Sequence, residues 1–142
     1  MAADDEAALL CHRYVELLDD GTPETYGSDA FLSLCAPDLA WFEAPTLWQP
    51  EGRSGGLDDL RAVVAGDAVL FHDRHAELHD CIADGGEAAI RYTRRLTIAA
   101  EDLPFPRGAT VIGEVAAFIE VRNGKIIELR EYPSCPRVRS GG

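Results

Sequence analysis

Residues 113–132 read GEVAAFIEVRNGKIIELREY and carry the clearest structural pattern in the chain. Two strand-like runs flank Asn123-Gly124. Such a pair predicts a tight β-hairpin, because both residues tolerate the positive φ of a primed turn. In the second run, Ile127, Leu129 and Glu131 share one face by the two-residue period of a strand. A carboxylate on an otherwise apolar face needs a partner or a function.

The regions before this hairpin change from helical to strand-like patterns. Helices are expected first, joined by one short strand, and strands follow from His75 onward. The expected helices cover residues 4–19, 22–34 with a break at Gly27-Ser28, and 57–71. Between the second and third helices, we expect a turn at Ala36-Pro37-Asp38, a short strand over 39–44 and a loop over 45–56. The later strands cover 77–84 and 87–98, joined by a turn at Gly85-Gly86, and a loop over 99–109 leads to the hairpin at 110–132. Helices before an antiparallel meander indicate an α+β fold, with the helices on one face of a curved sheet.

Length and charge restrict the class of protein. The 142 residues fit one domain, expected at 1–135, followed by a disordered tail at 136–142. The net charge of −12 disfavours nucleic acid and anionic membranes as partners, because both require a basic surface. No apolar run approaches the ~20 residues of a membrane span. The four cysteines form no CxxC motif and follow no secretory leader, so free thiols in a cytoplasmic protein are expected.

A second polar residue lies on an apolar strand face. Arg94 shares the parity of Tyr92 and Leu96 and is expected to point inward. A guanidinium there keeps its charge and needs a carboxylate or an anionic ligand. Glu114 and Glu131 are the candidate partners. An Arg94–Glu131 pair either fixes strand register as a buried ion pair or serves chemistry in which Glu131 transfers protons.

These elements, in this order and ending in GKIIELREY (residues 124–132), resemble the cone-shaped NTF2-like fold, in particular its SnoaL-like and ketosteroid-isomerase-like branch. The resemblance covers about residues 7–133. It implies a sheet that wraps a helix-capped apolar pocket. Members of this branch include ketosteroid isomerases, polyketide cyclases, limonene-type epoxide hydrolases and binding proteins. The resemblance therefore implies a small, largely apolar organic ligand and, for cyclase chemistry, no metal or cofactor.

The resemblance also suggests roles for individual residues. Tyr14 matches the first-helix tyrosine with which ketosteroid isomerases hydrogen-bond the developing enolate oxygen. The general-base aspartate of those isomerases falls on Ala44, before Pro45, and their second acid falls near Ala116. Steroid isomerisation by that mechanism is therefore not expected. Glu131 is similar in position to the acid on the last strand with which SnoaL-like cyclases abstract an α-proton.

Limonene-type epoxide hydrolases are a second template. Arg94 and Glu131 match two members of their Asp-Arg-Asp arrangement, whereas the remaining acid falls on Leu96, or on Thr97 if the register is read from Arg95. Glu114 could replace it from the neighbouring strand. The expected catalytic residues are therefore Glu131 as base, Arg94 as orienting cation and anion stabiliser, and Tyr14 as hydrogen-bond donor.

Parity and position also indicate which residues contact substrate. Either Trp41 with Glu43, or Phe42 with its neighbours of the same parity, lines the pocket entrance. Trp48, in a proline-containing loop, is a lid or a packing residue. His72 can reach the pocket mouth, but solvated turn histidines explain the His72-x-x-His75 spacing more simply, so no metal site is predicted. The expected substrate-binding residues are Trp41, Phe42, Trp48, Phe71, His72, Tyr92, Leu96, Glu114, Phe118 and Leu129.

The function expected from these observations is general acid–base catalysis without a cofactor. The substrate would be a small, largely apolar carbonyl or epoxide compound that is cyclised, isomerised or hydrolysed. The alternative is a non-catalytic ligand-binding or dimerisation module in which the Arg94–Glu131 pair is structural. Either function is compatible with a homodimer, which is expected because one outward parity series would be too apolar for solvent. That series is Val111, Val115, Ala117, Ile119 and Val121.

Overall fold

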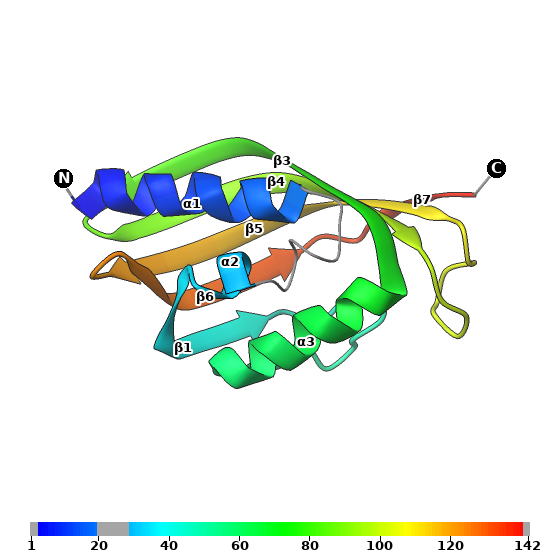
Figure 1. Cartoon of the computed structure of the whole chain (residues 1–142). Coiled ribbons are helices and arrows are strands. Elements are labelled where there is room, and N and C mark those ends of the chain that lie inside the picture. Colours follow the sequence, from blue (N-terminus) through cyan, green and yellow to red (C-terminus); the bar gives the residue numbers. More distant parts are fainter. Residues whose placement is uncertain (1–2, 20–28, 141–142) are drawn as a thin grey trace.

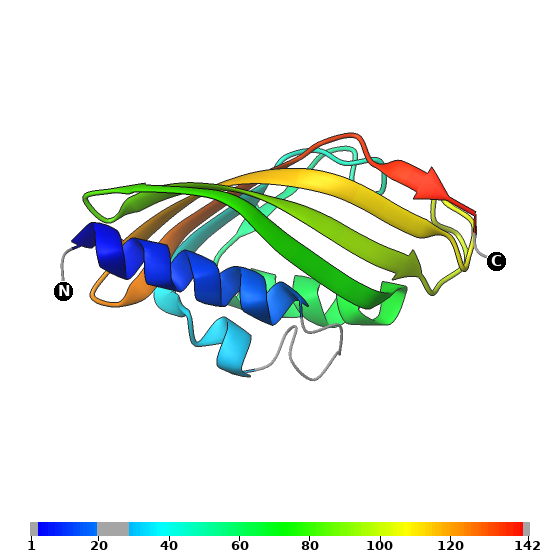
Figure 2. The ribbon, with the colours of Figure 1, turned by 90° about the horizontal axis from the view of Figure 1, so that it is seen from above.

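The computed structural model describes residues 3–19 and 29–140, in which helices lie on one face of a curved sheet (Figures 1 and 2). The elements are α1 (Ala3–Asp19), α2 (Asp29–Leu32), β1 (Cys35–Glu43), β2 (Arg53–Gly55), α3 (Leu57–Leu70), β3 (Phe71–Asp84), β4 (Glu87–Ile98), β5 (Thr110–Arg122), β6 (Lys125–Pro133) and β7 (Arg137–Arg139). The expected helix over 22–34 lies largely outside the described residues, and its described part is α2.

The sheet has the order β2-β1-β6-β5-β4-β3, and β7 pairs with β5. Neighbouring strands are antiparallel except β1 and β6, which are parallel. Asn123 and Gly124 adopt φ values of 53° and 74° between β5 and β6, which confirms the predicted hairpin. Gly85 and Gly86, at 60° and 89°, form the predicted turn between β3 and β4. The fold class is therefore the α+β arrangement that the sequence predicted.

The first long strand is longer than expected. β1 begins at Cys35 rather than at Leu39, so the predicted turn at Ala36-Pro37-Asp38 belongs to the strand. The pairing of β1 with β6 shifts register between Cys35 and Ala40. Because a strand tolerates proline at such irregularities, the proline did not mark a turn.

The transition from α3 to β3 also differs from the expectation. β3 begins at Phe71, directly after the helix, and its pairing with β4 shifts register between His72 and His75. Asp73 has a positive φ of 49° at this bulge. Because a bulge inserts an extra residue into the alternation, both Phe71 and Arg74 are buried.

Part of the segment expected to be disordered forms a strand. Arg137–Arg139 pairs with Thr110–Ile112 of β5. The pairing of β6 with β5 covers only Val115–Arg122, so β5 extends past the end of β6. In this remainder, β7 pairs with Thr110–Ile112, and the backbone of Glu114 forms hydrogen bonds with Ser134.

Cross-strand pairing fixes which face of β5 is buried. Val115 lies opposite Tyr92, and Ala117 lies opposite Ile90. Residues directly opposite one another point to the same face of a sheet, so β5 buries the series that contains these two residues. The buried members of that series are Val111, Val115, Ala117 and Ile119. The expectation that this series faces outward was wrong, and so was the argument for a homodimer that it supported.

The outer face of the sheet carries an outer aromatic cluster of Phe42, Phe118, Tyr132 and Arg130. The ring centroid of Tyr132 lies 5.7 Å from that of Phe42 and 5.8 Å from that of Phe118, which is 52% exposed. The guanidinium carbon of Arg130 lies 5.4 Å from the centroid of the Phe42 ring. Alternation therefore places Phe42 and Phe118 on the outer face, opposite their buried neighbours, and not on the inward face that the prediction assumed.

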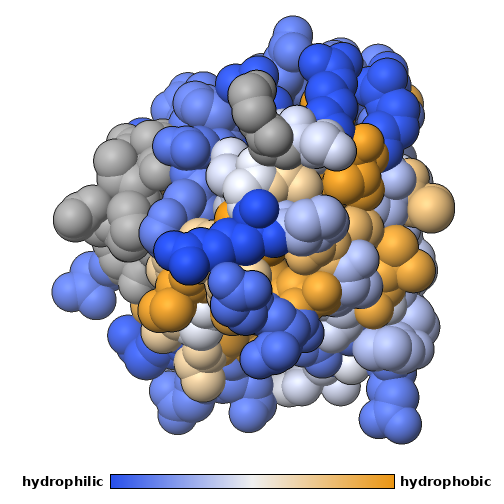
Figure 3. Space-filling model, turned by 90° about the vertical axis from the view of Figure 1, so that its right-hand side faces the viewer, coloured by the Kyte–Doolittle hydropathy of each residue, from blue (hydrophilic) through white to orange (hydrophobic). Residues whose placement is uncertain are grey.

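One end of the molecule holds the loop over 99–109, the end of α3 and β7 (Figure 1). Its surface mixes hydrophobic and hydrophilic side chains (Figure 3), and the exposed hydrophobic residues include Val69 of α3 and Val138 of β7. Within residues 3–19 and 29–140, no helix is long and apolar enough to cross a membrane.

Candidate active site

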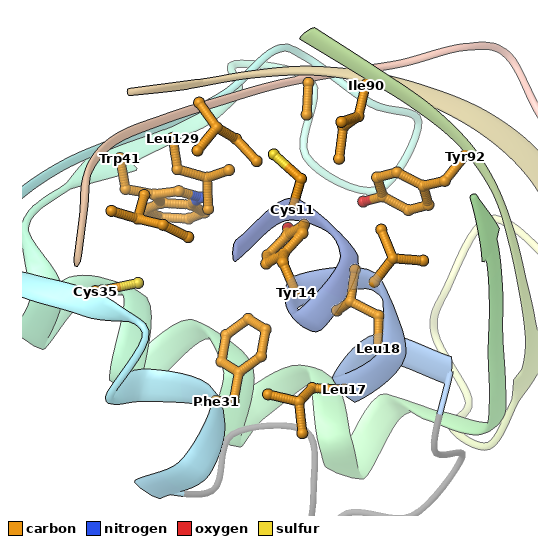
Figure 4. Close-up of a cluster of buried hydrophobic side chains, with 14 of the residues drawn as sticks. Cys11, Tyr14, Leu17, Leu18, Phe31, Cys35, Trp41, Ile90, Tyr92 and Leu129 are labelled. Atoms are coloured by element: carbon orange, nitrogen blue, oxygen red, sulfur yellow. The ribbon is translucent and has the colours of Figure 1, made fainter. Parts of the chain in front are cut away.

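Glu131 is buried between two tyrosines. Tyr14 Oη, from α1, donates a hydrogen bond of 2.5 Å to Glu131 Oε1, and Tyr92 Oη, from β4, donates one of 2.6 Å to Oε2. The rings of both tyrosines point into the interior beneath the sheet (Figure 4). Burial and the charge of Glu131 raise the pKa of Tyr92 well above its ordinary value. The Tyr92 phenol therefore remains a donor at neutral pH.

The local structure explains why these groups converge. Tyr14 lies on the buried stripe of α1 with Ala7, Cys11 and Leu18, at helical spacing. In β6, a register shift opposite Glu120 and Val121 gives the buried place to Ile126 rather than to the predicted Ile127. Leu129 and Glu131 are both buried, as the sequence predicted.

A second buried carboxylate lies beside Glu131. Glu43 is its register partner on the parallel strand β1, and the two residues are 4% and 8% exposed. Side chains of such partners share one face, about 4.8 Å apart along the hydrogen-bonding direction. Burial raises the pKa of Glu43 above its ordinary value, the Glu131 charge raises it further, and the Arg53 charge opposes this shift.

Arg53 joins Glu43 to a third carboxylate. Its Nε and Nη2 lie 3.0 Å and 2.9 Å from Glu43 Oε1, while Nη1 and Nη2 lie 3.2 Å from the two oxygens of Asp67. Asp67 is buried on α3, in line with Leu60 and Val64. The helix begins where the Asp59 carboxylate accepts a 2.8 Å hydrogen bond from the Gly56 amide. The resulting Glu43–Arg53–Asp67 unit is a carboxylate–arginine–carboxylate arrangement.

These groups line a small inner cavity. Its walls include Tyr14, Glu43, Arg53, Asp67, Arg74, Tyr92, Arg94 and Glu131, with Trp41 and Leu129 among the apolar members. Its volume of about 20 Å³ accommodates roughly one water molecule. The cavity thus places polar groups of both signs around a volume far smaller than an organic substrate.

A larger outer pocket adjoins the inner cavity. It has a volume of about 360 Å³, within the range of ~300–1,000 Å³ usual for ligand sites, and is lined by four prolines, Trp48 and Leu96 among others. Arg94 lines both spaces, and among the described residues it alone does so. Its guanidinium carbon lies 5.8 Å from the Trp48 ring, which packs against Phe71 at 5.5 Å. Arg94 therefore connects the polar interior to the apolar pocket.

Most of the predicted site residues lie at these two spaces. The inner cavity brings together Glu131, Arg94, Tyr14, Tyr92, Trp41 and Leu129, and the outer pocket brings together Trp48, Leu96 and Glu114. Phe71 is buried beneath Trp48. Of the two alternatives for β1, the one with Trp41 and Glu43 inward is confirmed.

Two further predictions need correction. Glu114 is exposed at the rim of the outer pocket, where its Oε1 lies 2.6 Å from Arg91 Nη1, so it does not face inward as a partner for Arg94. Its register partner is Thr93, which lies on the face opposite Arg94. His72 is exposed at the β3 bulge and lines neither space.

Among residues 3–19 and 29–140, no group of three or more His, Cys, Asp and Glu side chains is arranged to hold a metal ion. All four cysteines are free thiols, as expected. Of the four cysteines, the exposed Cys135 lines the outer pocket, whereas Cys11, Cys35 and Cys81 line neither space. Burial raises the pKa of Cys11 to about 12 and that of Cys35 to about 11, so neither is a nucleophilic thiolate at neutral pH.

The sequence did not single out Arg53, Asp67 or Arg74. One of them had a usable signal, because Asp67 completes the helical series of Leu60 and Val64. Arg74 is turned inward by the bulge, and Arg53 reaches the site through the pairing of β2 with β1. Neither effect is visible in local periodicity.

Several solved structures share the fold of this chain. A polyketide-cyclase candidate from Xanthomonas campestris pv. campestris is 22% identical, with a TM-score of 0.71 over 92% of each chain. IdmH, a polyketide-cyclase candidate from Streptomyces antibioticus, is 21% identical, with a TM-score of 0.71 over 90% of this chain and 91% of that chain. An LEH-like epoxide hydrolase from M. tuberculosis is 17% identical, with a TM-score of 0.68 over 92% of this chain and 84% of that one. At these identities the likeness shows the fold, which is NTF2-like.

The family is shown by the sequence. The SnoaL-like domain matches residues 11–129, and the chain belongs to the SnoaL-like family. No curated protein matches the sequence.

Proposed function

We propose that this protein is a cofactor-free acid–base enzyme that acts on a small, largely apolar carbonyl compound. Glu131 is the proton acceptor, Tyr14 a hydrogen-bond donor and Arg94 the orienting cation. The observation that carries the proposal is the setting of Glu131. It is a buried carboxylate, held by two tyrosines, in a cavity joined through Arg94 to an apolar pocket of ligand size.

The two spaces have different roles in this proposal. The apolar body of the substrate occupies the outer pocket, against Trp48 and Leu96, where burial of apolar surface drives binding. Its carbonyl end reaches Arg94 at the boundary with the inner cavity. Because the inner cavity is small, the reacting carbon must enter it by displacing side chains or water.

The chemical step is proton abstraction from the carbon next to the carbonyl group. A Glu131 oxygen takes the proton, and the electron pair of the C–H bond moves to form an enolate. The developing negative charge is stabilised by the Arg94 cation and by a phenol donor such as Tyr14, and this stabilisation is strong in a site that excludes water. The enolate is the nucleophile that an aldol-type cyclisation or an isomerisation requires.

Epoxide hydrolysis is a second candidate, favoured by a specific observation. The inner cavity, which Glu131 lines, has room for about one water molecule, and the Glu43–Arg53–Asp67 unit supplies further acid groups. In this reaction Glu131 would take a proton from water while an acid protonates the epoxide oxygen. The similarity to an epoxide hydrolase fold supports testing this reaction alongside the first.

Deuterium exchange tests proton abstraction without the natural substrate. Ethyl acetoacetate, 2-tetralone and 1-indanone are incubated with the protein in D₂O, and loss of the α-proton signals is followed by NMR. We expect faster exchange than in buffer for at least one ketone. Glu131→Gln is expected to slow this exchange by about 10²–10⁴-fold, the usual contribution of a general base.

Glu128→Gln is the matched control, because Glu128 lies on the same strand but lines neither the inner cavity nor the outer pocket. It is expected to leave the exchange rate unchanged. Styrene oxide in ¹⁸O-labelled water provides the epoxide arm, in which labelled diol is the product. Equal activity of the wild type and Glu131→Gln in every active assay would exclude Glu131 as the proton acceptor. Saturable quenching of tryptophan fluorescence by the probes without any turnover would favour the non-catalytic binding module instead.

A further inference from the structure

We propose that Glu43 and Glu131 form one catalytic unit that holds a single proton near neutral pH, with Glu43 as the general acid and Arg53 as its positioning residue. This inference rests on the proposed function and adds the proton donor that the reaction needs. The carrying observation is that two buried acids are register partners on adjacent parallel strands and line the same cavity.

The backbone holds the two acids together. Glu43 pairs with Glu131 in the register of β1 and β6, and the amide of Ala44 donates a 2.9 Å hydrogen bond to the Glu131 carbonyl oxygen. Both side chains point away from solvent, so neither can relieve repulsion by turning outward. Two buried carboxylates at strand-neighbour distance do not both ionise readily, and one of them keeps a proton.

The different partners of the two acids decide which one keeps the proton. Glu131 accepts hydrogen bonds on both oxygens, and a carboxylate that accepts two such bonds favours its charged form. On Glu43, both Arg53 contacts reach Oε1, so a proton on this acid belongs on Oε2. Burial also acts to raise the pKa of Glu43.

Other charged groups face the same cavity and enter the balance. They are Arg53 from β2, Asp67 from α3, Arg74 from β3, Arg94 from β4 and the phenols of Tyr14 and Tyr92. With Glu43 and Glu131 ionised, three acids face three arginines. With one shared proton the cavity carries one net positive charge, which favours an enolate over a neutral ketone.

The catalytic step is balanced in protons and electrons. Glu131 takes the α-proton, the C–H electron pair forms a carbon–carbon double bond, and the carbonyl π pair takes the proton from Glu43 Oε2. Glu131 is then neutral and Glu43 is ionised. Because the two acids are neighbours, the proton can return from Glu131 to Glu43 and restore the starting state.

Arg53 acts through Glu43 rather than on the substrate. Its guanidinium donates two hydrogen bonds of 3.2 Å to Asp67 and also contacts Glu43 Oε1. The fork geometry allows both contacts at once, which a lysine cannot reproduce. Arg53 is therefore expected to set both the orientation and the pKa of the acid.

A carboxyl titration tests the shared proton without any substrate. The full chain is labelled with ¹³C at glutamate side-chain carboxyls, and NMR follows them from acid to alkaline pH, with Glu43→Gln and Glu131→Gln providing the assignments. We expect Glu43 to be protonated at a pH at which exposed glutamates are ionised. Glu131→Gln should lower the titration midpoint of Glu43, because a neighbouring charge is lost, and Arg53→Met should raise it. A Glu43 midpoint that does not respond to Glu131→Gln would overturn the unit.

Kinetics with the exchanging ketone test the role of Glu43. We expect Glu43→Gln to lower kcat by about 10²–10⁴-fold with little change in KM. One limb of the pH–rate profile reflects ionisation of the general acid. Arg53→Met should shift this limb to higher pH, and Arg53→Lys should shift it less. A purely structural role of Arg53 would not shift it. Full activity of Glu43→Gln beside an inactive Glu131→Gln would refute the acid role and leave the proposed function intact. Coupled titration without exchange of any probe would contradict the proposed function and still support the shared proton.

Discussion

Tyr92 and Glu131 form a 2.6 Å hydrogen bond although their strands, β4 and β6, are separated by β5. Two strand spacings amount to about 9.6 Å, so in a flat sheet the two side chains alone would have to span the distance between the backbones of β4 and β6. The curvature of the sheet turns the inner faces of β4 and β6 toward one another (Figure 2). The length of the tyrosine side chain covers the remainder. The hydrogen bond between Tyr92 and Glu131 therefore depends on the curvature of the sheet.

Tyr92→Phe is expected to destabilise the protein by about 1.5–3 kcal/mol, the usual contribution of a hydrogen bond to a charged group. The change removes one hydroxyl and leaves a buried carboxylate with one donor fewer. Urea unfolding measures the loss. Tyr132→Phe is the control, because Tyr132 lies on the exposed outer face, and its effect should stay within about 0.5 kcal/mol. Equal effects of the two variants would contradict a stabilising role for the Tyr92 bond.

Glu43 is expected to make stability depend on pH in the direction opposite to that of an acid whose pKa is lowered in the folded state. Its pKa in the folded state is raised above the ordinary 4.5, so between these two values the folded state binds more protons than the unfolded state. The stabilisation that Glu43 contributes is therefore fully present below pH 4.5, its pKa in the unfolded state. It is lost as the pH rises through the pKa of the folded state, by about 1.4 kcal/mol for each pH unit between the two pKa values. Urea unfolding of the wild type and of Glu43→Gln across this range gives the difference. A difference that is constant with pH would show that Glu43 ionises normally.

Trp48→Ala is expected to weaken binding of the ketone probes. The ring packs on Phe71 and stacks with Arg94, so its removal opens the outer pocket and frees the cation. The loss should be about 0.5–2 kcal/mol of binding free energy, seen as a higher KM with a smaller change in kcat. Trp48→Phe keeps an aromatic face and should retain most of the affinity. Unchanged KM in both variants would place the ligand elsewhere.

The homodimer stays a prediction, and the outer aromatic cluster is now its expected interface. Phe118, 52% exposed, packs against Tyr132 in this cluster, and apolar patches of this kind often mark interfaces. We expect Phe118→Glu to convert a dimer into a monomer in sedimentation velocity. Val69→Glu, at an exposed position of α3, should leave the dimer intact. A wild-type monomer at micromolar concentration would disprove the prediction.

The parts of the fold that the sequence revealed are those set by local chemistry. Asn123-Gly124 and Gly85-Gly86 determine their turns through backbone conformations that few other residues adopt. The inward facing of Glu131 and the place of Arg94 at the cavity wall followed from alternation along single strands. Tyr14 followed from the helical stripe and from the family resemblance.

The parts that the sequence missed depend on pairing between distant segments. In β5 both parities are apolar, so only the register of Val115 opposite Tyr92 decides which face is buried. Arg74 and Ile126 owe their inward positions to bulges, which change the alternation by one residue. Arg53 enters the site because the short β2 pairs with β1. Such non-local effects leave no periodic pattern in the sequence.

The outer pocket is walled by chain segments that directly follow the two acids. Thr46 to Pro50 comes after Glu43, and Pro133 to Pro136 comes after Glu131. The acids themselves are fixed by strand pairing and by α1, α3 and β4, which these segments do not form. Much of the lining that determines substrate range thus comes from segments next to the acids, whereas Arg94 and Leu96 of β4 complete the pocket. Exchange of the two proline-containing segments between family members offers a route to new ligand specificity with the acid pair left in place.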